Sequence, residues 1–381
     1  MTSPEAAPSF RAWTHSTPPF PSTLSLIQQS PPKPADLKPH EILVEVVTAA
    51  LNPVDVQVKN LPIFRLAALK YPKGIGCDFA GRILGKGTEV KDLQIGAEVM
   101  GMTFNPLGGV NYGTLSEIAV IDMSRSCVVA KPPALPWVQA AAIPLVYLTA
   151  KTLLSPPYLI LPPSANPDPT DASSHRIQPT IVVLGGSSSV GQYVVQLAKK
   201  QLHFKVIATC SKRNVDFVQE LGADEVIDYT VEDVVQRVKE LRPAEGYVQI
   251  VDCVGGTDFL PHIPSLVSPR TKAYPAGGSY QTIVGDKTSR LAMGGSILYL
   301  THPTMLVRML KGWAGIGYRY SCIMLNATRR DWLAQVGRLV HDEGLRVEID
   351  SEWEFEEVEK AYEKLNTGKV RGKVVVHVKH E

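Results

Sequence analysis

The sequence lacks the features of a disulphide-bonded secreted protein. Its 381 residues include five cysteines, and no two of them are spaced as a CxxC pair. An odd, scattered set of thiols in so long a chain is typical of a reduced, intracellular protein. We therefore expect a cytoplasmic location, with a mitochondrial location as the alternative.

The chain also has no excess of charge of one sign and no long apolar run. It has 39 Lys and Arg against 37 Asp and Glu, which gives a net charge of +2. This balance argues against a nucleic-acid partner held by counterion release. The start of the chain lacks the apolar centre of a secretory signal. The most apolar stretch, residues 291–310, contains His302, Pro303 and Arg308, so we expect no transmembrane segment.

Two patterns of secondary structure divide the chain, which is long enough for two domains. From Glu41 onward, short apolar runs are separated by frequent glycines, which predicts a mainly β domain. A Pro-rich stretch, residues 156–179, is typical of a surface loop. After it, apolar runs alternate with helical patterns, which indicates a parallel sheet with right-handed crossovers.

A glycine-serine turn opens this second region. The apolar run at residues 181–184 is followed by Gly-Gly-Ser-Ser-Ser-Val-Gly at residues 185–191, then by a helical pattern and a second apolar run at residues 206–209. Strand, glycine turn, helix and strand form a dinucleotide-binding unit, in which backbone N–H groups at a helix N-terminus approach a pyrophosphate. The turn residues that we assign to the cofactor are Gly186, Ser187, Ser188, Ser189, Val190 and Gly191.

The end of the second strand predicts which dinucleotide binds. NAD sites usually place an acidic residue about 20 residues beyond the glycines, where it binds the ribose 2′-hydroxyl. Here that place holds Ser211, followed by Lys212 and Arg213. A hydroxyl and two cations attract a 2′-phosphate, so we predict NADPH. The alternative is that Lys212 and Arg213 simply form a solvated loop.

With these motifs the chain resembles the medium-chain dehydrogenase/reductase superfamily, and within it the zinc-free quinone oxidoreductases. Among these it resembles the reticulon-interacting oxidoreductases and their fungal relatives, which include enoyl reductases of polyketide pathways. The resemblance covers nearly the whole chain from about Glu41 onward. The matching runs are Ala50–Asp55, Pro72–Gly81, Gly96–Gly101, Gly113–Glu117, Ala140–Pro144, Leu221–Asp224, Val226–Tyr229 and Arg371–Val376.

The resemblance implies an α/β fold with a GroES-like β domain and a Rossmann doubly wound parallel sheet. On this basis residues 1–148 form the GroES-like catalytic domain, residues 149–326 the Rossmann domain, and residues 327–381 a segment that completes the first domain. It further implies that Ser187 to Val190 hold the pyrophosphate, that Ser211 and Lys212 bind the 2′-phosphate, and that two subunits form a homodimer. Tyr229 would pack at the adenosine end, and Arg371 would return toward the cofactor.

A metal site is not expected, and Asn52 is the residue that we predict to be catalytic. Zinc-dependent members carry Gly-His-Glu where this chain has Gly76-Cys77-Asp78, and zinc needs three or four suitable ligands. Without zinc, a neutral amide can stabilise the oxyanion. Asn52 follows a strand directly and, by resemblance, lies near the nicotinamide. The alternative is a turn-capping asparagine.

The proton donor and the substrate stay open at this point. Tyr71, Tyr112 and Tyr147 are candidate donors, and Phe64, Leu66 and Leu69 could line an apolar cleft. Enoyl reductases of the superfamily place a tyrosine shortly after the Asn-Pro motif, but residues 59–64 here contain none. We therefore predict an NADPH-dependent, zinc-independent reductase of a quinone or an α,β-unsaturated carbonyl compound. The alternatives are a trans-acting enoyl reductase of a polyketide pathway and a cofactor-binding interaction protein with little catalysis.

Overall fold

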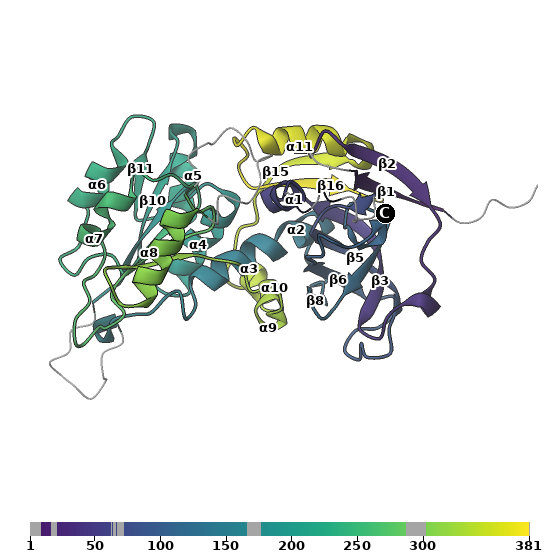
Figure 1. The fold of residues 1–381 in the computed structure, drawn as a ribbon, viewed down its shortest axis with the longest axis horizontal. Coiled ribbons are helices and arrows are strands. Elements are labelled where there is room, and N and C mark those ends of the chain that lie inside the picture. Colours follow the sequence, from purple (N-terminus) through teal and green to yellow (C-terminus); the bar gives the residue numbers. More distant parts are fainter. Residues whose placement is uncertain are drawn as a thin grey trace, which may run out of the picture. The chain divides into compact units, whose positions relative to one another are not determined.

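The computed structural model describes residues 9–16, 21–61, 63, 66, 72–165, 177–286 and 302–380. It consists of two compact units (Figure 1). The first, here called the β-rich unit, comprises Met1–Leu148, Leu291–Ile297 and Ala327–Glu381. The second, here called the α/β unit, comprises Thr149–Arg290 and Leu298–Asn326.

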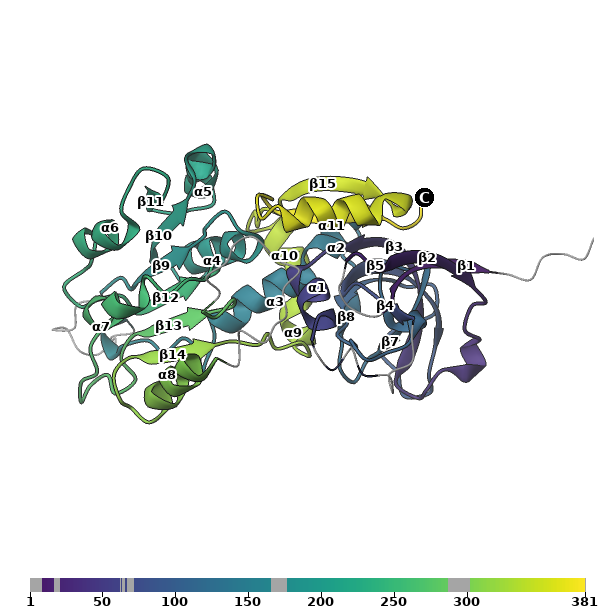
Figure 2. The same cartoon turned by 45° about the horizontal axis from the view of Figure 1, so that its top comes forward.

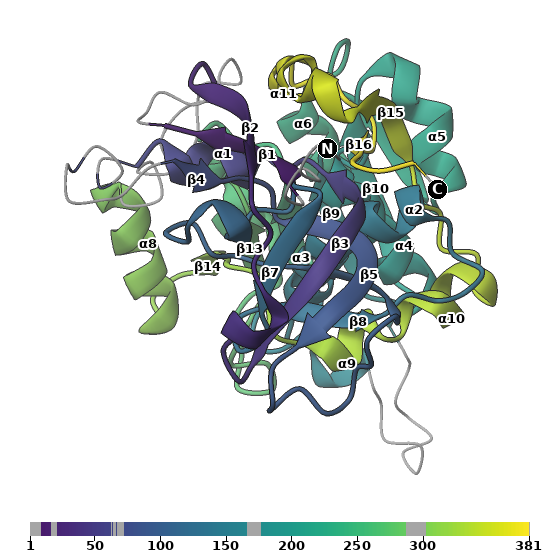
Figure 3. The same cartoon turned by 90° about the vertical axis from the view of Figure 1, so that its right-hand side faces the viewer.

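The β-rich unit is built on a seven-stranded sheet that joins the two ends of the chain. Its order is β15-β16-β3-β5-β6-β8, with β7 also paired to β3. The C-terminal strand β16 is antiparallel to β3, with Val375 opposite Ala50, and Figure 3 shows these strands in yellow and purple. The strands are β3 (Glu41–Ala50), β5 (Asp78–Lys86), β6 (Glu98–Met102), β7 (Ile118–Asp122), β8 (Cys127–Ala130), β15 (Ile349–Glu354) and β16 (Lys373–His377).

Smaller elements cover this sheet. A three-stranded sheet has the order β2-β1-β4. Helix α11 buries Val358, Ala361, Tyr362 and Leu365, whose i, i+3, i+4, i+7 spacing forms one helical face. This face joins β3, β5 and β16 in one apolar core. The remaining elements are β1 (Phe10–His15), β2 (Leu24–Gln29), β4 (Lys73–Gly74), α1 (Pro53–Lys59), α2 (Trp137–Ala142), α9 (Arg330–Leu333), α10 (Val336–His341) and α11 (Val358–Asn366).

The α/β unit contains a six-stranded sheet with the order β11-β10-β9-β12-β13-β14 (Figure 2). Every neighbouring pair is parallel. If these strands are numbered 1 to 6 along the chain, their order in the sheet is 3-2-1-4-5-6. This is the doubly wound arrangement, which binds dinucleotides where the strand order reverses. The strands are β9 (Thr180–Leu184), β10 (Lys205–Cys210), β11 (Glu225–Asp228), β12 (Gln249–Asp252), β13 (Ser279–Thr282) and β14 (Arg319–Cys322).

The helical pattern that follows the glycine-serine turn is α4, in which Val190, Val194, Leu197 and Ala198, spaced i, i+4, i+7, i+8, are all buried. Among the described residues, no helix is both long enough and apolar enough to cross a membrane. The helices are α4 (Ser189–Lys200), α5 (Val215–Glu220), α6 (Val234–Glu240), α7 (Ile263–Leu266) and α8 (Pro303–Trp313); α3 (Pro144–Leu153) begins in the β-rich unit and ends in this one.

Several elements differ from the sequence-based expectations. The sequence predicts a strand at residues 347–349 and a helix at residues 332–341. The strand begins only at Ile349 and runs to Glu354, and the helix is two short helices, α9 and α10. The sequence gives no clear prediction for residues 260–320, which include α8, and the apolar residues of α8 lie on both its buried and its exposed sides. Residues 166–176 of the Pro-rich stretch and residues 291–301 of the apolar stretch lie outside the described residues.

Candidate functional site

The glycine-serine turn connects β9 to α4 at the carboxyl end of the sheet. Gly185 has φ +86°, a backbone conformation that glycine adopts readily. The Gly186 N–H donates to the Thr209 carbonyl at 2.8 Å, and a Cβ on Gly186 would lie 2.9 Å from the Ala208 Cβ. A Cβ on Gly191 would lie 2.1 Å from the Gly185 carbonyl oxygen. These glycines are therefore needed for packing of the turn against β10 and α4.

The three serines of the turn have different surroundings. Ser188 is the N-cap of α4, and its hydroxyl accepts a hydrogen bond from the Gly191 N–H at 3.1 Å. The Ser187 hydroxyl accepts from the Asn214 amide at 3.2 Å. Ser189 and Val190 begin the helix, where the helix dipole favours an anion.

Asn214 joins the turn to the end of β10. Its amide nitrogen lies 3.2 Å from the Ser187 hydroxyl and 3.4 Å from the Ser211 hydroxyl. Because each hydroxyl accepts from Asn214, each keeps its own proton for donation to a ligand oxygen. The structure thus brings together two serines that the sequence separates by a whole helix and strand, and it does so through a residue that sequence reasoning missed.

The neighbouring strand β11 adds a tyrosine and a carboxylate beside Ser211. The register pairs Cys210 with Asp228, and the Tyr229 N–H donates to the Cys210 carbonyl at 3.1 Å. Tyr229 is 44% exposed. The pKa of Asp228 is lowered, first by a hydrogen bond from the Thr230 hydroxyl and also by the Lys212 ammonium. A carboxylate therefore lies near the cation predicted to bind the 2′-phosphate.

Arg371 belongs to the other unit, in the turn before β16. Its guanidinium is 2.9 Å from a Glu348 carboxylate oxygen, and its backbone N–H donates to Asp350 at 2.7 Å. A role for Arg371 at the cofactor stays a prediction.

Asn52 is buried in the β-rich unit at the end of β3 and is 1% exposed. Its amide nitrogen donates to the Ala50 carbonyl at 3.2 Å and to Asp78 at 3.0 Å, and its amide oxygen accepts from Lys373 at 2.6 Å. Its backbone N–H donates to Asp55 at 2.8 Å, an interaction typical of a helix N-terminus. Both amide protons thus have internal acceptors, an arrangement that the capping alternative describes well.

Lys373 and Asp78 form a buried ion pair beside Asn52. The ammonium lies 3.0 Å from an Asp78 oxygen, and the two side chains are 3% and 0% exposed. The second oxygen of Asp78 accepts from the Leu145 N–H at 3.0 Å. Burial raises the pKa of Asp78, while the Lys373 charge and the Asn52 hydrogen bond act in the opposite direction. Lys373 is separated from these partners by most of the chain, so sequence reasoning missed it.

This arrangement does not fit a zinc ion. The Lys373 ammonium contacts both Asn52 and Asp78, so a cation already occupies the place between these two groups. Among the described residues, no group of three His, Cys, Asp or Glu side chains is placed to hold a metal.

Asp55 is a second buried carboxylate in this cluster, and its position was not assigned a role from the sequence. One oxygen accepts from the Asn52 N–H at 2.8 Å and from the Tyr362 hydroxyl at 3.3 Å. Burial raises the pKa of Asp55 to about 6, although hydrogen bonds from Cys77 and Asn52 oppose the shift. Asp55 therefore changes its charge at a higher pH than an exposed aspartate does.

Two of the candidate proton donors, Tyr112 and Tyr147, lie among the described residues and have different surroundings. The Tyr112 hydroxyl donates to Glu41 at 2.9 Å. Tyr147 is fully buried in α3, and burial raises its pKa. Leu66, a candidate for the cleft wall, is 55% exposed. Tyr71, Phe64 and Leu69 lie outside the described residues.

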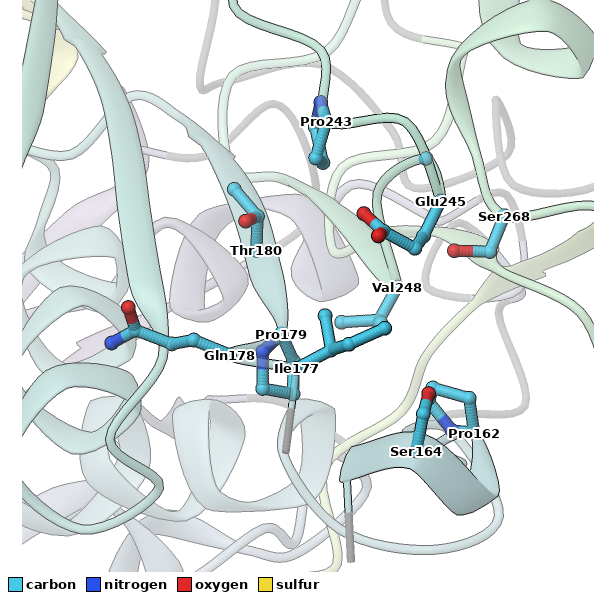
Figure 4. A pocket seen from close by; sticks show the side chains of 11 residues that line it. Pro162, Ser164, Ile177, Gln178, Pro179, Thr180, Pro243, Glu245, Val248 and Ser268 are labelled. Carbon is cyan, nitrogen blue, oxygen red and sulfur yellow. The ribbon is translucent and has the colours of Figure 1, made fainter. Parts of the chain in front are cut away.

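A small pocket in the α/β unit lies away from the glycine turn. It is lined by both apolar and polar side chains, among them Pro179, Val248, Thr180 and Glu245, at the amino ends of β9 and β12 (Figure 4). Ligands of doubly wound sheets bind at the carboxyl ends of the strands. This pocket is therefore not the candidate nucleotide site.

Comparison with known proteins places both units in described families. Residues 38–133 match the alcohol dehydrogenase GroES-like domain, and residues 221–376 match the zinc-binding dehydrogenase family. A trans-enoyl reductase of Aspergillus terreus is 30% identical over 97% of this chain and 96% of its own length. A mitochondrial NAD(P)H oxidoreductase of Mus musculus is 30% identical over 89% of this chain and 82% of its own. The structure of a quinone oxidoreductase from Coxiella burnetii has a TM-score of 0.72 at 25% identity, covering 98% of this chain and 100% of that one.

Proposed function

Because the chain belongs to the medium-chain dehydrogenase/reductase superfamily and is an oxidoreductase that uses a nicotinamide cofactor, we propose that it is an NADPH-dependent reductase that acts without zinc. The acceptor in this proposal is a quinone or an α,β-unsaturated carbonyl compound. The membership and the fold expected from the sequence are thereby confirmed. The observation that carries the cofactor proposal is the Asn214 bridge between Ser187 and Ser211.

NADPH supplies a hydride when it is bound, and this chain's residues supply binding and orientation. In the proposal, Ser187, Ser189 and the backbone of Val190 hold the pyrophosphate, with Ser188 and the glycines shaping the turn. Ser211 and Lys212 bind the 2′-phosphate, since a hydroxyl donor and an ammonium suit a doubly charged group. Tyr229 packs on the adenosine, and Arg371 is the contribution of the C-terminal segment.

In the proposal, the Asp228 carboxylate weakens the preference for NADPH over NADH without reversing it. It lies on the neighbouring strand, and the Thr230 hydroxyl already donates to it at 2.6 Å. The residue at the position that usually binds the 2′-hydroxyl is Ser211, which carries no charge to repel a phosphate. The proposal is therefore NADPH over NADH, with Asp228 limiting the size of the preference.

Asn52 is the proposed group that polarises the substrate carbonyl. To donate to a substrate, its amide must exchange the bond to Ala50 or the bond to Asp78. In the capping alternative, Asn52 instead holds Lys373 and Asp78 in place. The Asn52→Ala variant distinguishes the two roles of Asn52. A fall in kcat with an unchanged KM for NADPH and an unchanged free energy of unfolding supports polarisation of the substrate carbonyl. A fall in kcat accompanied by a loss of stability supports the capping role.

Zinc independence is tested by dialysis against a strong chelator. We expect the same kcat before and after dialysis, because Lys373 occupies the place between Asn52 and Asp78. Loss of turnover that added zinc restores would contradict this part of the proposal.

The trans-acting enoyl reductase is the second candidate function, and the Aspergillus terreus relative supports it. The run Lys59–Phe64 contains no tyrosine, which argues against it. NADPH oxidation measured with quinones, small enones and an enoyl thioester distinguishes the candidates. Turnover mainly with the thioester would favour the enoyl reductase. NADPH binding with no turnover on any of the three would favour an interaction protein.

A homodimer and a cytoplasmic location complete the proposal. Strand β14 ends the described sheet of the α/β unit, and an open edge of a parallel sheet can pair with a second copy. Light scattering on the purified protein tests the dimer. The Mus musculus relative is named mitochondrial, which keeps the mitochondrial alternative open for a fractionation experiment.

A further inference from the structure

A buried carboxylate, Asp252, lies at the carboxyl end of β12 in the α/β unit and is 1% exposed. One of its oxygens accepts from the Val254 and Gly255 N–H groups at 2.9 and 2.8 Å. The other accepts from the Tyr280 and Thr282 hydroxyls at 2.9 and 3.1 Å. Burial of a carboxylate is unfavourable unless donors surround it. Here the donors come from the turn after β12 and from the neighbouring strand β13.

The Thr282 hydroxyl extends these contacts to a second turn, the one after β13. Thr282 is opposite Asp252 in the parallel pairing of β12 and β13. Its oxygen donates to Asp252 and accepts from the Val284 and Gly285 N–H groups at 3.1 and 2.9 Å. The Asp252–Thr282 pair therefore holds the turns after two neighbouring strands in one fixed arrangement.

The turn after β12 packs against the glycine-serine turn. The Cys253 N–H donates to the Leu184 carbonyl at 3.0 Å. A Cβ on Gly185 would lie 2.4 Å from the Val254 Cγ1, so the Val254 side chain lies directly against the first glycine of the glycine-serine turn. Figure 2 shows β9, which precedes that turn, between β10 and β12.

The strand order indicates which half of the cofactor would lie near the Asp252–Thr282 pair. In the proposed function, the 2′-phosphate binds at the end of β10 and the pyrophosphate binds at the turn after β9. A dinucleotide extends across the carboxyl edge of a doubly wound sheet at the point where the strand order reverses. With its adenosine half on the β10 side of β9, its nicotinamide half would lie on the β12 side, near the turns after β12 and β13.

We propose that Asp252 and Thr282 are positioning residues that fix the nicotinamide ring for hydride transfer, an inference that rests on the proposed function. Both side chains act through the backbone of the two turns and need not touch the cofactor. Hydride transfer depends on the distance and angle between donor and acceptor, and a misplacement of about 1 Å can cost about 100-fold in rate. Loss of the link between the turns therefore slows hydride transfer while the adenosine half stays bound.

The first test compares Thr282→Val with Thr282→Ser. Valine keeps the shape of threonine but removes the hydroxyl that joins the two turns, whereas serine keeps that hydroxyl. For Thr282→Val, we expect kcat for quinone reduction to fall at least about tenfold. The primary isotope effect with NADPH deuterated at both C4 positions should rise, because hydride transfer becomes slower relative to the other steps. Thr282→Ser should keep both values close to those of the native chain.

The second test separates positioning from a general loss of folding. Adenosine 2′,5′-bisphosphate carries the 2′-phosphate and lacks the nicotinamide. Its dissociation constant should be unchanged in Thr282→Val, whereas that of NADPH should rise about threefold. Thr180→Val is the matched control, because Thr180 is 5% exposed and lies at the opposite, amino end of β9. This control should leave kcat, the isotope effect and both dissociation constants unchanged.

Two results would overturn the positioning role. The first is a kcat and an isotope effect in Thr282→Val equal to those of the native chain. The second is an equal weakening of NADPH and of the bisphosphate in Thr282→Val, which would mean that the Asp252–Thr282 pair stabilises the whole α/β unit.

Failure of the proposed function gives different results. A native chain that binds neither NADPH nor the bisphosphate would overturn both proposals. A native chain that prefers NADH would contradict only the choice of cofactor. The positioning role is then tested by the same comparison with NADH and ADP, because NADH carries the same nicotinamide half.

Discussion

Asn52, Asp78 and Lys373 meet in the interior of the β-rich unit, where each is 3% exposed or less, whereas Ser187, Ser211 and Asn214 meet at the carboxyl end of the sheet in the α/β unit. In the buried cluster, the Asn52 amide and the Lys373 ammonium donate to internal acceptors, and Lys373 forms an ion pair with Asp78. In the cluster at the sheet edge, the Ser187 and Ser211 hydroxyls accept from Asn214, which leaves their protons for a ligand. The comparison indicates that the first region stabilises the β-rich unit, and it supports the proposal that the second region binds a phosphate.

The largest effect in this comparison is expected for Lys373→Met. Removal of the ammonium leaves Asp78 as a buried carboxylate without its cation, which costs about 3–5 kcal/mol of the free energy of unfolding. Urea unfolding measures the loss. The control is Lys379→Met, because Lys379 is 53% exposed and its pair with Glu45 should contribute less than about 1 kcal/mol. If Asp78→Leu added to Lys373→Met failed to restore stability, the cost would not come from the unpaired charge.

A smaller effect is expected from the pH dependence of Asp55. Its folded pKa, about 6, exceeds the unfolded value of about 3.9, so the folded state binds the proton more tightly. The protonated group stabilises the fold fully below about pH 4, and this stabilisation is lost as the pH rises to about 6. As the pH rises from 4 to 7, the free energy of unfolding of the Asp55→Asn variant should therefore increase by about 2–3 kcal/mol relative to that of the native chain. Parallel pH profiles of urea unfolding would contradict the raised pKa.

In the α/β unit, Ser211→Asp should weaken NADPH binding about 30-fold, because its carboxylate would face the 2′-phosphate. NADH binding should stay the same or improve. Ser211→Ala is the matched control. Its NADPH affinity should fall only a few-fold, since the change removes one hydrogen bond without adding charge. Fluorescence titration measures both cofactors. Equal losses for NADPH and NADH would place Ser211 away from the 2′-phosphate.

The smallest effect concerns Asp228→Asn, which removes the carboxylate near Lys212. NADPH affinity should rise about threefold, an effect that high salt reduces. Asp36→Asn, an exposed change in the β-rich unit, should leave the affinity unchanged. A fall in NADPH affinity for Asp228→Asn would mean that the carboxylate orders the site rather than opposing the phosphate.

The two regions also differ in how far the sequence predicts them. The glycine-serine turn, α4 and the end of β10 were predicted because one short stretch of chain contains the whole unit and its periodicity. Asp228 was missed because it is adjacent to Cys210 only through strand pairing. Asn214 was missed because its hydrogen bond to Ser187 joins the segment after β10 to the turn after β9. Lys373 was missed because its contacts with Asn52 and Asp78 join residues at opposite ends of the chain.

The central claim, that the α/β unit selects NADPH, is tested most directly by one measurement on the native chain. Fluorescence titration with NADPH and with NADH, under the same salt and pH, gives the ratio of the two dissociation constants. The serine and lysine around the proposed phosphate position predict binding of NADPH at least about tenfold tighter, with a preference that falls as salt increases. Equal dissociation constants for the two cofactors would contradict the account.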